Sequence, residues 1–305
     1  MKNLIKADIR YFLISKSILW IILLFGILCS ANSFMCYQYA NQSLQQYKNT
    51  YNYMEESGAD IEAELSKDYI LHEGNNIENP LSYFKEQAEK SMYNISPQNI
   101  LASFGESCTI FAPIIAVLVA TLLVSQDEKN KTARLKVARN GKTRFMISKQ
   151  ISGILLLLTI VFVGLGLTAI LNNMFYNDLQ SKADVPPLAI NLTQENNILH
   201  YIIYVILVTV IFFEIGYTIS NIFHCYTAIT IVVSIISFFA PPFIKYDPIN
   251  LKCFFENKIF LFEGVVTPTT PIPISTSEAV IELIVLVATI IIINYVTSIK
   301  KSAYN

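Results

Sequence analysis

The chain has 305 residues, a formal net charge of −1, 53% hydrophobic residues and 15% charged residues. Soluble domains carry roughly a quarter charged residues, so this composition excludes an ordinary water-soluble protein. A membrane-spanning helix needs about 20 mainly apolar residues. The sequence therefore predicts an all-α polytopic membrane protein with six transmembrane helices. The predicted spans are residues 17–36, 107–124, 145–171, 198–223, 227–244 and 279–299.

Basic residues near the span ends indicate the orientation, since Lys and Arg are retained on the cytoplasmic side. The first 16 residues carry four of the 22 basic residues, residues 125–150 carry eight and the C-terminal end carries two. The opposite side holds 18 of the 23 acidic residues. We therefore expect both termini and loop 125–144 to be cytoplasmic. The predicted extracellular segments are 37–106, 172–197 and 245–278.

Residues 1–16 predict an amphipathic helix at the cytoplasmic interface. Its basic face carries Lys2, Lys6 and Arg10. Its apolar face carries Ile5, Ile9, Phe12 and Leu13. This pattern is typical of a helix lying at a membrane surface, and the alternative is a frayed basic leader.

Residues 37–106 predict a helical extracellular domain with 11 acidic residues, four lysines and eight tyrosines. Apolar residues three and four apart extend the first span outward as a helix as far as Met54. Further helices are expected over 60–70 and 80–92, and another starts at Ser96-Pro97. This domain either handles substrate or a partner, or it is a lid that stabilises the membrane part.

Loop 125–144 predicts a short cytoplasmic helix. Thr132 is placed to cap a helix over 133–139, and Asn140-Gly141 supplies a stop and a turn into the third span.

The sequence Gly141-Lys142-Thr143 looks like the end of a phosphate-binding loop. That motif needs a glycine five positions before Gly141, where this chain has Lys136. We therefore expect the chain itself to bind no ATP and no other cofactor.

Glu214 lies in the inner half of the fourth predicted span. Carboxylates inside a membrane are costly and mark functional sites by default. Two interpretations stay open, a role with substrate or protons and a packing hydrogen bond with Tyr217 or Ser220. Glu282, near the outer end of the sixth span, is expected to reach the interface.

Residues 245–278 are unusually apolar for an external loop. Pro268, Pro271 and Pro273 exclude one long helix here, which predicts a re-entrant or interfacial segment. Ser275 and Glu278 form a capping box that starts the sixth span.

The sequence holds no recognisable catalytic or metal-binding arrangement. His72, His200 and His224 lack metal-ligand spacing. Cys36 and Cys108 are predicted to end the first two spans on the same side and could meet, but spacing does not establish a disulfide. The basic loop has no interleaved aromatic residue except Phe145, which argues against a nucleic-acid partner.

A resemblance to a known family comes from the basic start, the six spans and the first cytoplasmic loop. In order, the loop reads Asp127-Glu128, Lys131-Thr132, Leu135, Gly141-Lys142-Thr143-Arg144 and Ser148-Lys149. These features resemble the ABC-2 type permeases, the membrane subunits of ATP-binding-cassette exporters. That family usually has Gly-Thr where this chain has Lys131-Thr132.

The resemblance implies that the loop forms a coupling helix that docks on a separate ATPase subunit, and it supports the re-entrant segment. The candidate ATPase contacts are Glu128, Thr132, Arg134, Leu135, Arg139 and Arg144. The alternative is that these charges only set the topology.

On this resemblance we expect the permease subunit of an exporter that moves a peptide, lipid-like molecule or drug outward. Its expected partners are two ATPase subunits, which bind the ATP, and a second copy of itself or a paralogue. We expect a multi-pass protein of a bacterial plasma membrane. The alternative is a membrane-anchored sensor or immunity protein whose acidic extracellular domain binds a cationic peptide.

Overall fold

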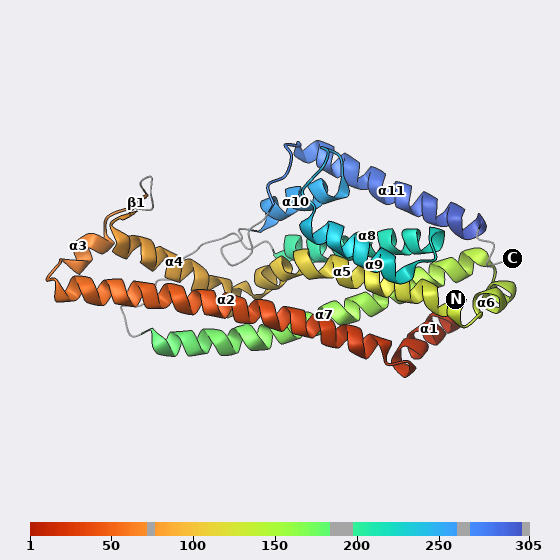
Figure 1. The fold of residues 1–305 in the computed structure, drawn as a ribbon, viewed down its shortest axis with the longest axis horizontal. Coiled ribbons are helices and arrows are strands. Elements are labelled where there is room, and N and C mark those ends of the chain that lie inside the picture. Colours follow the sequence, from red (N-terminus) through yellow and green to blue (C-terminus); the bar gives the residue numbers. More distant parts are fainter. Residues whose placement is uncertain (72–76, 184–197, 261–268, 301–305) are drawn as a thin grey trace.

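The computed structural model describes residues 1–71, 77–183, 198–260 and 269–300. These residues form an elongated, almost entirely helical bundle (Figure 1). The first half contains α1 (Lys2–Ile14), α2 (Ser17–Glu56), α3 (Ile61–Leu65), β1 (Ile70–Leu71), β2 (Ile77–Glu78), α4 (Pro80–Asn94), η1 (Pro97–Asn99) and α5 (Ile100–Lys129). The second half contains α6 (Ala133–Asn140), α7 (Lys142–Lys182), α8 (Ile198–Ile222), α9 (Tyr226–Phe239), α10 (Pro248–Ile259) and α11 (Thr276–Lys300).

The two longest helices reach well beyond a membrane. α2 has 40 residues and α7 has 41, so each is about 60 Å long against a hydrocarbon core of about 30 Å. They pack together and, with α4, form the narrow end of the molecule (Figure 1). Ala40, Leu44 and Leu179 share one small core there, and Tyr47 and Leu81 share another. This end holds most of the predicted extracellular segment 37–106.

One predicted helix in that segment is wrong. Residues 60–70 do not form one helix, because α3 ends at Leu65 and β1 pairs antiparallel with β2. Asn79 gives a physical reason. Its side-chain amide donates to the carbonyl oxygens of Glu64 and Lys67, at 2.7 and 2.9 Å, which satisfies the acceptors at the end of α3. The predicted starts at Pro80 and Ser96-Pro97 are present as α4 and η1.

α5 lies at the centre of the membrane part. α2 and α7 pack against it, and so do α8 and α9. A close approach between α7 and α8 depends on Gly153, because a Cβ atom there would lie 2.2 Å from the Phe213 ring. Pro113 stands inside α5 without interrupting the helix.

Within the described residues, five helices are long and apolar enough to cross a membrane, namely α2, α5 with η1, α7, α8 and α11. The prediction of six spans is not confirmed. α9 covers residues 227–239 of the predicted fifth span, 227–244, and has only 14 residues, about 21 Å. It ends just before Pro241-Pro242. α9 nevertheless runs back from the α6 end, so that α11 again starts away from α6, beside α10 (Figure 1).

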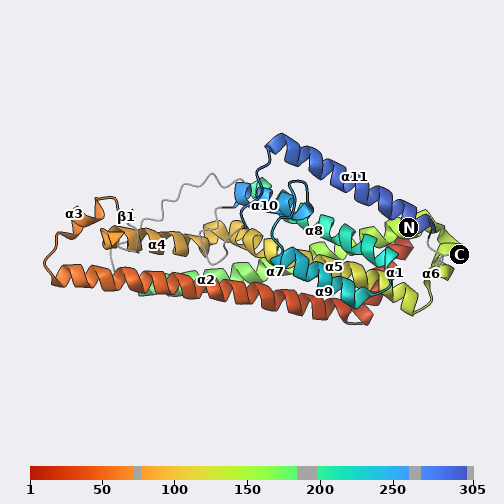
Figure 2. The same ribbon diagram turned by 45° about the horizontal axis from the view of Figure 1, so that its top comes forward.

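The last helices lie at the side of the bundle. α11 packs on α8 and α10 and leans away from α5 (Figure 2). The predicted capping box is present: the Ser275 backbone N–H donates to Glu278 Oε2 at 2.9 Å, and the Glu278 N–H donates to Ser275 Oγ at 3.3 Å. The re-entrant segment stays a prediction, since α10 occupies part of it and residues 261–268 lie outside the described residues. Residues 184–197 of the predicted outer loop also lie outside them.

Candidate functional site

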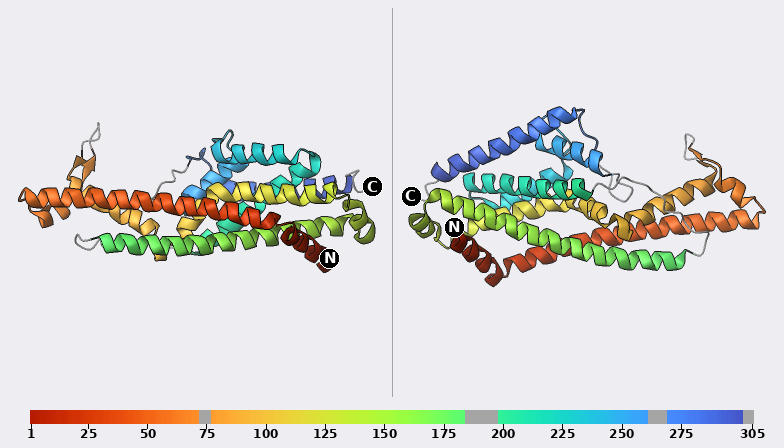
Figure 3. Two further views of the ribbon diagram at one scale, coloured as in Figure 1. Left: turned by 60° about the horizontal axis from the view of Figure 1, so that its bottom comes forward. Right: turned by 180° about the vertical axis from the view of Figure 1, so that it is seen from behind.

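The cytoplasmic loop contains the predicted short helix, α6. It ends at Asn140, and Gly141 turns the chain directly into α7 with φ 82° and ψ 152°. This backbone region is essentially restricted to glycine, and the stop predicted at Asn140-Gly141 is therefore confirmed. α6 lies beside α1 at one end of the molecule, and the end of α11 lies nearby (Figure 3).

Two carboxylates and two ammonium groups meet where α6 joins three other helices. Asp8 belongs to α1, Asp127 to α5, Lys136 to α6 and Lys149 to α7. Lys136 Nζ lies 2.9 Å from Asp8 Oδ1 and 2.8 Å from Asp127 Oδ1. Lys149 Nζ lies 3.1 Å from Asp8 Oδ1 and 2.5 Å from Asp127 Oδ2. Each cation bridges both carboxylates, and we call these residues the four-charge cluster.

The cluster is nearly dry. Asp8, Asp127 and Lys149 are buried, and Lys136 is partly exposed. Removing each ion from water costs several kcal/mol. In the cluster, contacts between opposite charges offset this cost. Burial lowers the pKa of Lys136, but the hydrogen bonds and charges of Asp127 and Asp8 outweigh burial and raise this pKa above its usual value. Lys136 is therefore charged at neutral pH, and the cluster ties α6 to α1, α5 and α7.

Thr132 does not act as the predicted helix cap. It occupies the N-cap position, but its side chain makes no capping hydrogen bond. Its hydroxyl donates instead to Asp127 Oδ1, at 2.6 Å. The buried carboxylate competes successfully for this hydroxyl because a hydrogen bond to an ionised acceptor is the stronger one.

The face of α6 opposite the cluster is open to solvent. Ala133 and Val137 are buried, whereas Arg134, Leu135 and Arg139 are exposed. Leu135 is 74% exposed, unusually high for a large apolar side chain. Arg144, at the start of α7, is also exposed. We call Arg134, Leu135, Ala138 and Arg139 the outer face of α6.

Glu128 points away from this face, toward the turn between α8 and α9. Tyr226 donates its hydroxyl to Glu128 Oε2, and His224 Nδ1 lies 3.0 Å from the same oxygen. Glu128 and Arg134 line a groove of about 510 Å³ beside α6. Arg139 and Arg144 are not among the groove residues. Apart from Thr132, which is bonded to Asp127, the candidate ATPase contacts therefore fall into two places, the groove and the exposed surface of α6 with the start of α7.

Glu214 lies in a polar group inside the membrane part. Gln150 Nε2 and Asn294 Nδ2 both donate to Glu214 Oε2, at 2.9 and 2.7 Å. Asn294 Oδ1 accepts from the Thr218 hydroxyl at 2.9 Å. The predicted partners Tyr217 and Ser220 make no hydrogen bond with the carboxylate, because amides on two neighbouring helices reach it instead. Glu214 lines a cavity of about 730 Å³ between α7, α8 and α11.

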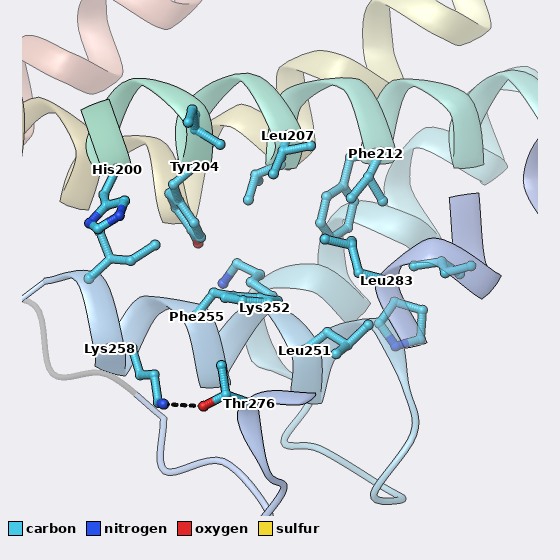
Figure 4. Close-up of a pocket in the computed structure, with 16 residues that line it drawn as sticks. His200, Tyr204, Leu207, Phe212, Leu251, Lys252, Phe255, Lys258, Thr276 and Leu283 are labelled. Carbon is cyan, nitrogen blue, oxygen red and sulfur yellow. Dashed lines mark hydrogen bonds between the residues drawn. The ribbon is translucent and has the colours of Figure 1, made fainter. Parts of the chain in front are cut away.

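A second cavity, of about 410 Å³, lies between α8, α10 and α11 (Figure 4). Two of its lining residues, Lys252 and Tyr204, hold the carboxylate of Glu256: Glu256 Oε1 lies 2.9 Å from Lys252 Nζ and accepts from the Tyr204 hydroxyl at 2.7 Å. Lys258 donates to the Thr276 hydroxyl at 2.5 Å (Figure 4). The charge of this carboxylate is therefore balanced within the protein.

The described part of the chain contains neither a metal-binding group of residues nor a disulfide. No group of three or more His, Cys, Asp and Glu residues there is placed to hold a metal ion. None of the five cysteines, all of which lie in the described residues, forms a disulfide, including Cys36 and Cys108, whose meeting the sequence left open.

Sequence reasoning missed the residues that organise both sites. Asp8 lies on the buried stripe of α1 with Leu4 and Phe12, four residues apart, and an acid at that spacing was a readable signal. On the predicted apolar face, Phe12 is buried and Leu13 is 54% exposed, and contact of this face with a membrane stays a prediction. Asn294 stands in the run IIIINY, where an amide is equally conspicuous.

Residues 2–280 match the family described as ABC-2 family transporter protein. The match spans most of the chain, and the protein belongs to this family. It is accordingly a multi-pass membrane permease of an ATP-binding-cassette exporter, a transport subunit that is not itself catalytic. Membership implies an ATPase partner and often a dimeric arrangement in the membrane. No curated protein and no solved structure matches the chain.

Proposed function

We propose that the ATPase subunits dock on the outer face of α6, and that the permease uses their motion to move an amphipathic or hydrophobic substrate outward. One observation carries this proposal: α6 is fixed on its inner face by the four-charge cluster and exposes Leu135 between Arg134 and Arg139. Arginine is enriched at protein interfaces, and a docked partner would remove the exposed Leu135 side chain from water.

The four-charge cluster supplies the mechanical connection. A push on α6 reaches Lys136, and the shared carboxylates pass it to α1, α5 and α7. α5 and α7 are themselves candidate spans. Packed helices switch between discrete arrangements and do not deform continuously, so displacement of one rigid end can rearrange the membrane part.

A second permease copy or a paralogue completes the proposed complex, because the helices of one chain are too few to enclose a route for a large substrate. The predicted sensor offers no role for the outer face of α6. For this reason we favour the exporter over a peptide-binding sensor.

The test is affinity purification of the tagged full chain from crosslinked membranes of its native host, followed by mass spectrometry. We expect the wild type to recover an ATP-binding-cassette ATPase and the Arg134→Glu, Arg139→Glu double variant to lose it. The matched control is Lys2→Glu, Lys6→Glu, which makes the same charge change at exposed positions on α1. Equal recovery with both double variants would remove α6 from the interface, and no ATPase with wild type would contradict the exporter.

A further inference from the structure

The cavity around Glu214 differs chemically from the cavity between α8, α10 and α11. The lining of the cavity between α8, α10 and α11 carries Lys252 and Lys258, and Lys252 forms an ion pair with Glu256 at 2.9 Å. In the Glu214 cavity, both hydrogen bonds to the carboxylate come from neutral amides and end on Oε2. Among the described residues that line this cavity there is no Lys, Arg or His. The carboxylate thus has no ion-pair partner among the described residues that line the cavity.

The rest of the lining is apolar. It consists mainly of Met146, Ile147, Ile154, Ile211, Ile290 and Ile291. Along α7 the lining runs from Thr143 to Ile154, about 17 Å. A volume of about 730 Å³ lies within the range of sites for drug-sized ligands. The cavity therefore offers a long apolar surface with one carboxylate.

The position of the cavity fits entry from the cytoplasmic side. Thr143 stands in the first turn of α7, next to Gly141 and α6, and Tyr295 lies near the end of α11. Both mark the end of the molecule that carries the four-charge cluster. Glu214 lies on α8 between this end of the cavity and the residues Val210 and Ile211, which lie further from α6.

We propose that this cavity binds an amphipathic cation, with the Glu214 carboxylate contacting the cationic group and the apolar lining holding the hydrophobic part. Gln150 and Asn294 are positioning residues, because both amides donate to Oε2, while none of the described residues donates a hydrogen bond to Oε1. The inference names a substrate class for the proposed exporter. It rests on that function for transport but not for binding.

The test uses the purified full chain in nanodiscs of neutral lipid, without ATPase. The probe is radiolabelled tetraphenylphosphonium, a permanent hydrophobic cation, and the control ligand is tetraphenylborate, an anion of nearly the same shape. We expect saturable binding of the cation by wild type and much weaker binding of the anion. Glu214→Gln, which keeps the hydrogen-bonding shape, should weaken cation binding about tenfold or more.

Two further variants locate the site. Glu282→Gln removes a carboxylate from another cavity on the same helix as Asn294, and it should bind the cation like wild type. Ile291→Trp fills the Glu214 cavity without changing charge and should also reduce binding. Undetectable cation binding by wild type, equal binding by Glu214→Gln, or equal binding of the anion would each overturn the inference.

The outcome is separable from that of the proposed export function. If tetraphenylphosphonium fails to bind while the ATPase is still recovered with the wild-type chain, only the proposed substrate class is contradicted. If the cation binds through Glu214 but no ATPase is recovered, the binding site is supported and the export function is contradicted.

Discussion

At the residue scale, both candidate sites depend on buried polar side chains that form ion pairs or hydrogen bonds with residues on other helices. In the four-charge cluster, Lys149 is buried and contacts both Asp8 and Asp127. In the Glu214 group, Asn294 bridges Glu214 and Thr218. Such groups are stable only as complete sets, because an unpaired polar atom in a dry interior carries its full desolvation cost.

We expect Lys149→Met to destabilise the protein by about 3–5 kcal/mol, since it leaves two buried carboxylates with one cation. The measurement is thermal unfolding of the detergent-purified chain. Arg144→Met is the control, because Arg144 is exposed on the same helix and its loss should change stability by less than about 0.5 kcal/mol. Adding Asp8→Asn to Lys149→Met should restore part of the lost stability, and strict additivity would argue against the cluster.

At the element scale, the turn between α6 and α7 determines how the coupling helix is presented. One residue, Gly141, separates the two helices. Its backbone conformation fixes the direction of α6 relative to α7, while Lys136 and Lys149 fix the rotation of α6 against the bundle. The local sequence thus sets the turn, and long-range ion pairs set the packing.

Gly141→Ala should cost about 1–3 kcal/mol, because a side chain is strained at this φ and ψ. Gly166→Ala is a control for which we expect the opposite change in the free energy of unfolding. Gly166 lies within helix α7 with nothing within 4 Å of an added Cβ, so alanine there should stabilise by about 0.5–1 kcal/mol. Thermal unfolding of both variants tests the difference. A neutral Gly141→Ala would show that the turn tolerates a side chain.

At the scale of the whole molecule, the helices place the coupling site and the outer domain at opposite ends. α1, α6 and the end of α11 lie together, and α3 with β1 lies at the other end (Figure 1). A bilayer of about 30 Å covers only part of α2 and α7. The basic loop predicts that the α6 end is cytoplasmic.

Labelling of single cysteines with a membrane-impermeant maleimide tests this sidedness. Cys225 is the exposed native cysteine and is first replaced by serine, while the other four are buried. Tyr53→Cys and Leu135→Cys are matched, because the native side chains are 72% and 74% exposed. We expect Tyr53→Cys to be labelled in intact cells and Leu135→Cys only after permeabilisation. The reverse pattern would invert the topology.

The sequence by itself determined the membrane class, the family resemblance, most helices and the stop at Gly141. These depend on local quantities, namely apolar run length, charge near span ends and the glycine-only backbone. The tertiary structure decided that α9 is short and that the Thr132 hydroxyl donates to Asp127. It also decided that Glu214 accepts hydrogen bonds from Gln150 and Asn294. Buried polar groups must find partners across helices that are distant in sequence, and only the packed bundle specifies which side chains meet.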